Sequence, residues 1–354
     1  MKRYFLVFLL HSFISGSVLG VSIKTPHYTW DEQDELVLAL IEHPKFQRLK
    51  HIEQHGIWSY LDTWEQKYNR YEHSLGVYAL LKRYNAPRIE QIAGLLHDVS
   101  HTVFSHVGDK IFGSLDPNHD AYQDIVHSQF LEDTGIAAVL RDHGLEPEQV
   151  DPKSGEFPML ECDLPDLCAD RIDYIIQGGL QSYYLSQPSV EFILDHLHYS
   201  KTNNRWYFDD IHAATMFSNV SLVMTENTWG SPSGTIAEYF LARALKACVD
   251  LKELKLQDIK HGKDLHAWQT IMKSTSQDAI TLRNLITNPN NVYQLLDTPH
   301  ESHQSFARKF RGVNPFIQNG TAQFIRLTKV ARVYREEFEK KKAISDKGIH
   351  VRYL

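Results

Sequence analysis

The chain has 354 residues, ordinary shares of apolar and charged residues, and a formal net charge of −7 with histidine neutral. That length accommodates one large domain with an extension, or two domains, and the acidic balance argues against broad nucleic-acid binding, which needs a basic surface. Its three cysteines, Cys162, Cys168 and Cys248, include no C-x-x-C pair, which excludes a disulfide framework and argues against a zinc-finger site.

The first residues resemble a secretory signal peptide, which we place at residues 1–20. A basic start precedes an apolar run from Tyr4 to Leu10, and Val18 to Gly20 offers small residues for cleavage. The apolar run is too short and too interrupted for a transmembrane span. We therefore expect an exported protein, secreted or periplasmic. The alternative is a cytoplasmic protein in which this segment is a buried N-terminal element.

Apolar residues at helical spacing predict an all-α fold for the rest of the chain. The expected helices span residues 31–42, 45–54, 71–84, 88–97, 119–132, 166–177, 209–226 and 235–254. A small β-hairpin is expected at residues 198–208, with Asn203 and Asn204 at its turn. We place a helical domain at residues 27–254 and a helical C-terminal extension at residues 255–354, whose charge run indicates a solvated helix face.

Three of the expected helices carry histidine or aspartate at the edge of the core. Histidine is the commonest metal-ligating side chain, and the chain contains 20 of them. His73 shares a helical stripe with Val77, so it points toward the core side. His97 and Asp98 end the next helix directly after an apolar run. Asp170 lies on a later helix, on the same face as apolar and aromatic residues.

Two imidazoles and two carboxylates from three helices would suit one divalent metal ion. Mixed nitrogen and oxygen ligation disfavours calcium and leaves Mn, Fe, Ni, Zn and Mg as candidates. Each residue also has a structural alternative, because an inward histidine is commonly a hydrogen-bonded core residue and an aspartate beside an arginine is usually an ion pair. The coincidence of four such residues favours the metal site.

Four segments carry a resemblance to a known family. They are HPKFQRLKHIEQHG, NRYEHSLG, GLLHDVSHTVFSH and ADRIDY, and in this order they resemble HD-domain metal-dependent phosphohydrolases. The most similar branch is that of the deoxynucleoside triphosphate triphosphohydrolases, including vertebrate enzymes that combine SAM and HD domains. The resemblance extends over about residues 29–250. It implies an all-α fold with His73, His97, Asp98 and Asp170 as ligands of one metal ion, which activates a water molecule for attack on phosphorus.

The same resemblance implies further roles. Asp109 matches a catalytic carboxylate, and the catalytic histidine, counted back from TGIAAVL, is His119, with His127 as the alternative. An Asp109–His119 pair could hold an imidazolium that protonates the leaving oxygen. The implied substrate contacts are Gln54, Arg70, His101, His106, Arg171 and Tyr174. For the two histidines in that set, hydrogen-bond support of the metal ligands is the alternative.

Three departures from the branch concern the substrate. Gly178 stands where the branch has an aspartate near the sugar. In the SHTV stretch, Ser100, Thr102 and Val103 replace two glycines and a proline of the branch. No lysine or arginine lies between Arg205 and Arg243, where the branch supplies cations that grip a triphosphate. We therefore expect a small phosphorylated substrate, a nucleotide or another phosphoester. The alternatives are a dNTP triphosphohydrolase and a catalytically silent scaffold that binds a nucleotide or a protein; a homo-oligomer stays open.

Overall fold

The computed structural model describes residues 20–61, 68–113, 121–300, 303–318, 320 and 323–354. The expected signal peptide, apart from Gly20, and the expected catalytic residue His119 lie outside the described residues. Among the helices that the structure describes, none is long and apolar enough to cross a membrane.

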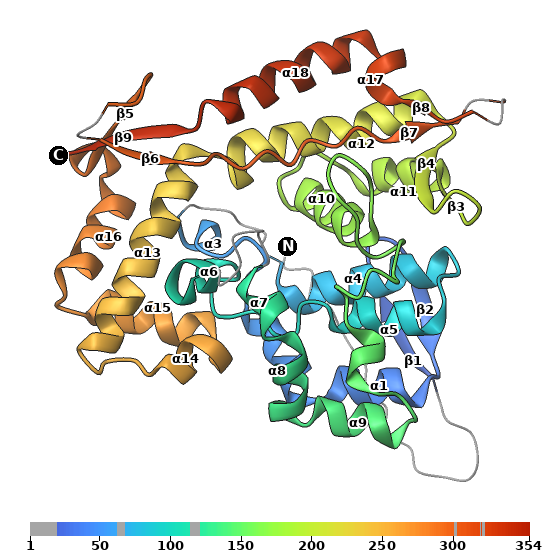
Figure 1. Ribbon diagram of the computed structural model, residues 1–354, viewed down its shortest axis with the longest axis horizontal. Coiled ribbons are helices and arrows are strands. Elements are labelled where there is room, and N and C mark those ends of the chain that lie inside the picture. The colour runs from blue at the N-terminus through green and yellow to red at the C-terminus, as the bar shows by residue number, and fades with distance from the viewer. Residues whose placement is uncertain (1–19, 62–67, 114–120, 301–302, 319, 321–322) are drawn as a thin grey trace.

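The protein is mostly helical, but three small sheets correct the expectation of an all-α fold (Figure 1). The strands are β1 (Val21–Lys24), β2 (Thr29–Glu32), β3 (Leu197–Ser200), β4 (Arg205–Phe208), β5 (Tyr293–Leu296), β6 (Gln304–Phe306), β7 (Phe316–Ile317), β8 (Ile325–Arg326) and β9 (Ile349–Tyr353). β3 and β4 form the expected hairpin, and β7 joins it in parallel, followed by β8. β1 pairs with β2, and β9 lies between β5 and β6. The C-terminal extension is therefore mixed rather than purely helical.

The observed helix ends agree best with the predicted ones where capping residues or other local sequence signals mark them. They are α1 (Glu35–Glu42), α2 (Pro44–Gln47), α3 (Trp58–Leu61), α4 (Arg70–Arg83), α5 (Arg88–Leu96), α6 (Val107–Phe112), α7 (Tyr122–Ile125), α8 (His127–Thr134), α9 (Ile136–Asp142), α10 (Ala169–Gln181), α11 (Gln187–Asp195), α12 (Ile211–Met224), α13 (Pro232–Asp250), α14 (Leu256–His261), α15 (Asp264–Lys273), α16 (Gln277–Thr287), α17 (Leu327–Val330) and α18 (Arg332–Asp346). The helix expected at residues 45–54 is instead α2 followed by a 3-10 turn.

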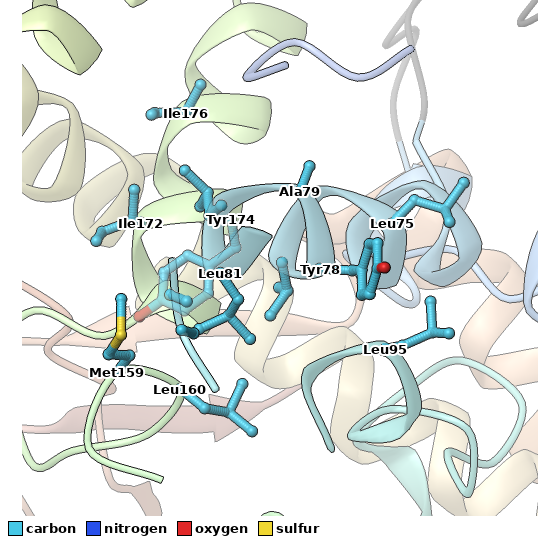
Figure 2. Close-up of a cluster of buried hydrophobic side chains, with 14 of the residues drawn as sticks. Leu75, Tyr78, Ala79, Leu81, Leu95, Met159, Leu160, Ile172, Tyr174 and Ile176 are labelled. Carbon is cyan, nitrogen blue, oxygen red and sulfur yellow. The ribbon is translucent and has the colours of Figure 1, made fainter. Parts of the chain in front are cut away.

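The first hydrophobic core holds α4, α5 and α10 together. Helix α4 begins at Arg70 because Asn69 and Glu72 form a capping box that satisfies two backbone N–H groups. Figure 2 shows the cluster around Leu81, to which α10 contributes Ile172 and the preceding loop contributes Leu160. These three side chains are fully buried, and each contributes about 1.5–3 kcal/mol of hydrophobic stabilisation. The core therefore fixes the helices on which the predicted metal ligands lie.

A second core joins the C-terminal part of the chain to two loops of the N-terminal part. Buried Ile57 and Phe104, from these loops, belong to the same cluster as Leu245 of α13, Leu282 of α16 and Val351 of β9. Helices α13 and α16 lie against each other. Residues on both sides of the boundary expected at residue 254 thus share one core.

Asp264 ties these loops to α15. Its carboxylate is buried and accepts the backbone N–H groups of Glu53 at 2.9 Å and Phe104 at 2.7 Å. Asp264→Ala would leave both donors without this acceptor, so we expect the free energy of unfolding in urea to fall by about 2–4 kcal/mol. The exposed control Asp142→Ala should change it by less than about 0.5 kcal/mol. Equal stability of the two variants would contradict the role given to Asp264.

Candidate active site

Helices α4 and α10 approach closely at Gly76. A Cβ atom placed on Gly76 would lie 1.8 Å from Oδ1 of Asp173 and 2.7 Å from Nε2 of Gln177. Both atoms belong to α10, so any larger residue at this position would push the two helices apart. This contact brings His73 of α4 next to Asp170 of α10.

Three predicted metal ligands converge on one point. The ligand atoms of His73, His97 and Asp170 all lie within 4.8 Å of one another. Nε2 of His73 is 2.9 Å from Oδ1 of Asp170 and 3.2 Å from Nε2 of His97. Two ligands bound to one ion at about 2.1 Å and at right angles would be about 3 Å apart. The donor set therefore fits one divalent transition-metal ion.

Asp98 lies beside this group. Its Oδ2 is 3.5 Å from Nε2 of His73, and its Oδ1 is 3.6 Å from Nε2 of His97. The carboxylate also accepts hydrogen bonds from Nη1 of Arg70 and, at 3.1 Å, from Nε2 of His101. These two donors hold Asp98 at the edge of the metal site, where an oxygen can complete a set of four ligands.

Hydrogen bonds on the far side of each imidazole aim both rings at the site. Nδ1 of His73 bonds to the carboxylate of Asp173, and Nδ1 of His97 is 2.7 Å from the carbonyl oxygen of Gly94. Because Nδ1 is engaged in each ring, Nε2 is left to face the metal position. The sequence prediction missed Asp173, although its spacing of three residues from Asp170 places both on one side of a helix.

The electrostatics of the site suit a cation. Burial opposes protonation of His73, but the surrounding carboxylates, Asp173 first, outweigh it and raise the pKa of His73 to about 10. Burial likewise opposes ionisation of Asp98, but Arg70 and His97 hold the pKa of this carboxyl well below its usual range. The carboxylates are thus ionised at neutral pH, and their negative charge favours a metal ion between them.

A second group of potential ligands shares Asp170 with the first. It consists of Glu161, Cys168 and Asp170. Burial raises the pKa of the Cys168 thiol well above its usual range, which opposes the thiolate that metal binding needs. The histidine-containing group is therefore the better metal site.

A pocket adjoins the metal site, and both cores contribute to its walls. The expected substrate contacts Gln54, Arg70, His106 and Tyr174 line it. Oε1 of Gln54 is buried and has no hydrogen-bond partner among the described residues, so it can receive a donor from a ligand. Nε of Arg70 donates to Oγ of Ser105 at 2.8 Å, which leaves the guanidinium fixed between the pocket and Asp98.

His101, His106 and Asp109 form a chain that leads away from Asp98. The rings of His101 and His106 meet edge to face with their centroids 4.9 Å apart. Nδ1 of His106 is 3.5 Å from Oδ2 of Asp109. Burial opposes ionisation of Asp109, but the contact with His106 and the N–H of Tyr122 lower its pKa to about 2. Within the described residues, His106 is therefore the histidine in contact with Asp109, although burial lowers the pKa of its ring.

Arg171, an expected substrate contact, does not reach the pocket. Its guanidinium donates to the carbonyl oxygens of Asp166 and, at 3.1 Å, Cys162, and it does not line the pocket. These bonds brace the loop that precedes α10. The structure therefore does not bring Arg171 to the other expected substrate contacts.

His127, the alternative catalytic histidine, is buried at the start of α8. Nδ1 of its ring is 3.2 Å from Oγ of Ser100, and burial lowers its pKa to about 4. Its Nε2 atom has no hydrogen-bond partner among the described residues. Because this low pKa keeps the ring neutral near pH 7, His127 is poorly suited to exchange a proton in catalysis.

The sequence did not predict two cations of the pocket. Lys309 and Arg311 line the pocket, although they lie far along the chain from the metal ligands. Their stretch, ARKFRGVNPF, has no helical or alternating pattern that would have marked it. The only available signal was the presence of two cations beside a phenylalanine.

Comparison with known proteins gives a consistent result. A family model described as the HD domain matches residues 70–177. The protein YdhJ of Bacillus subtilis, which is uncharacterized, is 30% identical over 323 residues, which cover 91% of this chain and 95% of that protein. The metal-dependent phosphohydrolase cns2 of Cordyceps militaris is 29% identical over 204 residues, or 56% of this chain and 58% of that protein.

More distant matches extend the comparison. The deoxynucleoside triphosphate triphosphohydrolase SAMHD1 of Danio rerio is 35% identical over 140 residues, which cover 34% of this chain and 22% of that protein. The crystal structure of a phosphohydrolase from Bacteroides thetaiotaomicron shares the fold, with a TM-score of 0.70 over 94% of this chain and 99% of that chain, at 16% identity. The chain therefore belongs to the HD-domain metal-dependent phosphohydrolase superfamily, near its deoxynucleoside triphosphate triphosphohydrolase branch.

Proposed function

We propose that the protein is a metal-dependent phosphoric ester hydrolase that acts on a nucleotide or another small phosphoester. The observation that carries this proposal is the convergence of His73, His97 and Asp170 within 4.8 Å, beside Asp98 and a pocket lined by Arg70. The relative named as a metal-dependent phosphohydrolase supports the same reaction class. Loss of one divalent metal ion should therefore abolish activity.

In such a reaction, different residues of the chain would have different roles. A divalent metal ion bound here would lower the pKa of a water molecule and stabilise negative charge on the phosphate. Arg70, fixed by Ser105 and Asp98, presents a guanidinium to the phosphate oxygens. Asp109 with His119, the pair implied by the family resemblance, would supply a proton to the leaving oxygen.

Two alternatives remain distinct from this proposal. A dNTP triphosphohydrolase is favoured by the cations Lys309 and Arg311 in the pocket and by the similarity to enzymes of that name. A catalytically silent scaffold that binds a nucleotide or a protein is the other. Phosphate and tripolyphosphate release over a panel of nucleotides, with Mn, Fe, Ni, Zn and Mg, distinguishes the three.

The metal ligands can be tested directly. His73→Ala and Asp98→Ala should each lose bound metal, from about one ion per chain to near zero, and lose phosphate release with it. Metal content is measured by mass spectrometry of purified protein loaded with each metal in turn. The matched control is His143→Ala, which removes an exposed imidazole and should keep both properties.

The result also decides between enzyme and scaffold. Full metal content in both ligand variants would refute the site. Normal metal binding by the unaltered protein, with phosphate release no greater than that of Asp98→Ala over the whole panel, would instead favour the scaffold.

Asp173 should affect metal affinity without being a ligand. Asp173→Asn weakens the acceptor that orients His73, so we expect the dissociation constant for the metal to rise by about 10- to 100-fold. Competition with a coloured chelator measures this value, and Asp142→Asn, at an exposed position, is the control. An unchanged metal affinity in a folded Asp173→Asn protein would contradict the orienting role.

The catalytic histidine is tested by comparing two variants. His119→Ala should lower kcat by about 10²- to 10⁴-fold while metal content stays normal, because a proton donor is removed and no ligand is. His127→Ala is the comparison, with the unfolding midpoint measured for both proteins. If only His127→Ala lowers kcat, the role belongs to His127; if neither does, the proton is delivered by another group.

A further inference from the structure

The loop between β1 and β2, residues 25–28, carries a buried histidine. Thr25 closes the turn, because its N–H donates to the carbonyl oxygen of Tyr28 at 2.9 Å. Oγ1 of Thr25 accepts the N–H groups of His27 at 3.3 Å and Tyr28 at 3.2 Å. The side chain of His27 is fully buried. Loop residues are usually exposed, and a buried imidazole needs a polar partner inside the protein.

Two helices hold this loop in place. Nη1 of Arg83, in the last turn of α4, donates to the carbonyl oxygen of His27 at 2.8 Å. Nε2 of Gln187, in α11, donates to the carbonyl oxygen of Pro26 at 3.2 Å. Both acceptors are backbone atoms, so these contacts fix the path of the loop and do not engage the imidazole.

The imidazole of His27 contacts the carboxylate that orients a metal ligand. Nε2 of His27 donates to Oδ1 of Asp173, and Nδ1 of His73 bonds to Oδ2 of the same carboxylate. The side-chain amide of Gln177 lies between them, with Nε2 2.9 Å from Oδ1 and 3.0 Å from Oδ2. All four side chains are buried. Each carboxylate oxygen therefore has an imidazole donor of its own, and this arrangement restricts rotation of the carboxylate.

These contacts connect the loop to the metal position. Without the N–H of His27, Oδ1 of Asp173 would keep only the contact with Gln177, and the last torsion of an aspartate side chain is soft. Rotation of the carboxylate would weaken the bond that orients His73. Nδ1 of His27 has no hydrogen-bond partner among the described residues. Within that part of the chain, the polar contact of this ring is therefore with Asp173 alone.

We propose that His27 is a positioning residue for the metal site, which acts on His73 through Asp173. It limits the rotation of the Asp173 carboxylate, so that one oxygen stays aligned with Nδ1 of His73. The loop between β1 and β2 thereby contributes to metal affinity, although it supplies no ligand. This inference rests on the proposed function, because it takes His73 as a ligand of the metal ion.

Binding of Co²⁺ to the full-length protein, measured by competition with a coloured chelator, tests this role without any substrate. His27→Phe keeps a ring in the buried space but removes the donor. We expect the dissociation constant to rise by about 10-fold, the lower end of the effect of losing a partner of a metal ligand. His27→Gln keeps an amide N–H near the position of Nε2, so it should bind Co²⁺ within about threefold of the unaltered protein.

Two further measurements distinguish positioning from a loss of stability. Trp30→Phe removes the bond from Nε1 of Trp30 to Oε2 of Glu32, and tryptophan has no second side-chain donor that could reach Asp173. This control should lower the unfolding midpoint but keep the Co²⁺ dissociation constant within about threefold. The visible absorption spectrum of bound Co²⁺ reports the arrangement of its ligands. It should shift in His27→Phe and return in His27→Gln.

A protein that combines His27→Phe with Asp173→Asn tests the route. Because His27 acts through Asp173, the combined variant should bind Co²⁺ within about threefold of Asp173→Asn alone. Additive losses would overturn the proposal, since His27 would then affect the metal site independently of Asp173.

The outcomes separate this proposal from the proposed function. Unchanged Co²⁺ affinity in folded His27→Phe, or an equal loss in His27→Gln or Trp30→Phe, would overturn the positioning role even if phosphoesters are hydrolysed. If His27→Phe does not fold, His27→Asn, whose amide is shorter by one methylene group, replaces it in the comparison with His27→Gln. Co²⁺ affinity that depends on His27 in a protein that hydrolyses no substrate would support the positioning role and refute the hydrolase.

Discussion

The close approach of α4 and α10 is the constraint on which the site depends. Asp173 lies at that contact and is fully buried, and an unpaired carboxylate there would be costly. It is instead surrounded by Nε2 of His27, Nδ1 of His73 and the side-chain amide of Gln177. The β1–β2 region, which supplies His27, and the two helices therefore meet at one carboxylate. Because that carboxylate orients the ring of His73, the packing of the first core also sets the geometry of the metal ligands.

The features that could be predicted from the sequence depend on short-range interactions. Helix α4 begins one residue before its predicted start, because the capping box at Asn69 and Glu72 is a local signal. The stripe that contains His73 and Val77 correctly placed that imidazole inward, since helical periodicity alone decides it. The expectation of an all-α fold was right for most of the chain, but it missed the small sheets other than the β3–β4 hairpin. Strands such as Phe316–Ile317 are too short to show alternation, and their pairing partners lie far away in the chain.

Motif position alone did not determine where each side chain points. Arg171 occupies a family substrate position, yet its guanidinium is bound to the carbonyls of Cys162 and Asp166, which is a property of the loop before α10. Lys309 could not be assigned to the pocket, because its place depends on an extended segment that docks beside Gly230. Such docking is a tertiary interaction, and no periodic pattern in the sequence reports it. Residues 206–242 contain no lysine or arginine, and the cations Lys309 and Arg311 reach the pocket from a different part of the chain.

Each of the two hydrophobic cores supplies part of the site, so a structural change in one core can affect one part of the site more than the other. The helices that carry His73 and Asp170 belong to the first core, whereas the loop that carries Phe104 packs in the second. Phe104 and Trp58 both line the pocket. A perturbation that loosens α13 to α16 should therefore reach the pocket walls before it reaches the metal ligands, because local opening follows the contacts of each core. The part of the pocket wall that Arg70 and Tyr174 supply, by contrast, moves with the helices that carry the metal ligands.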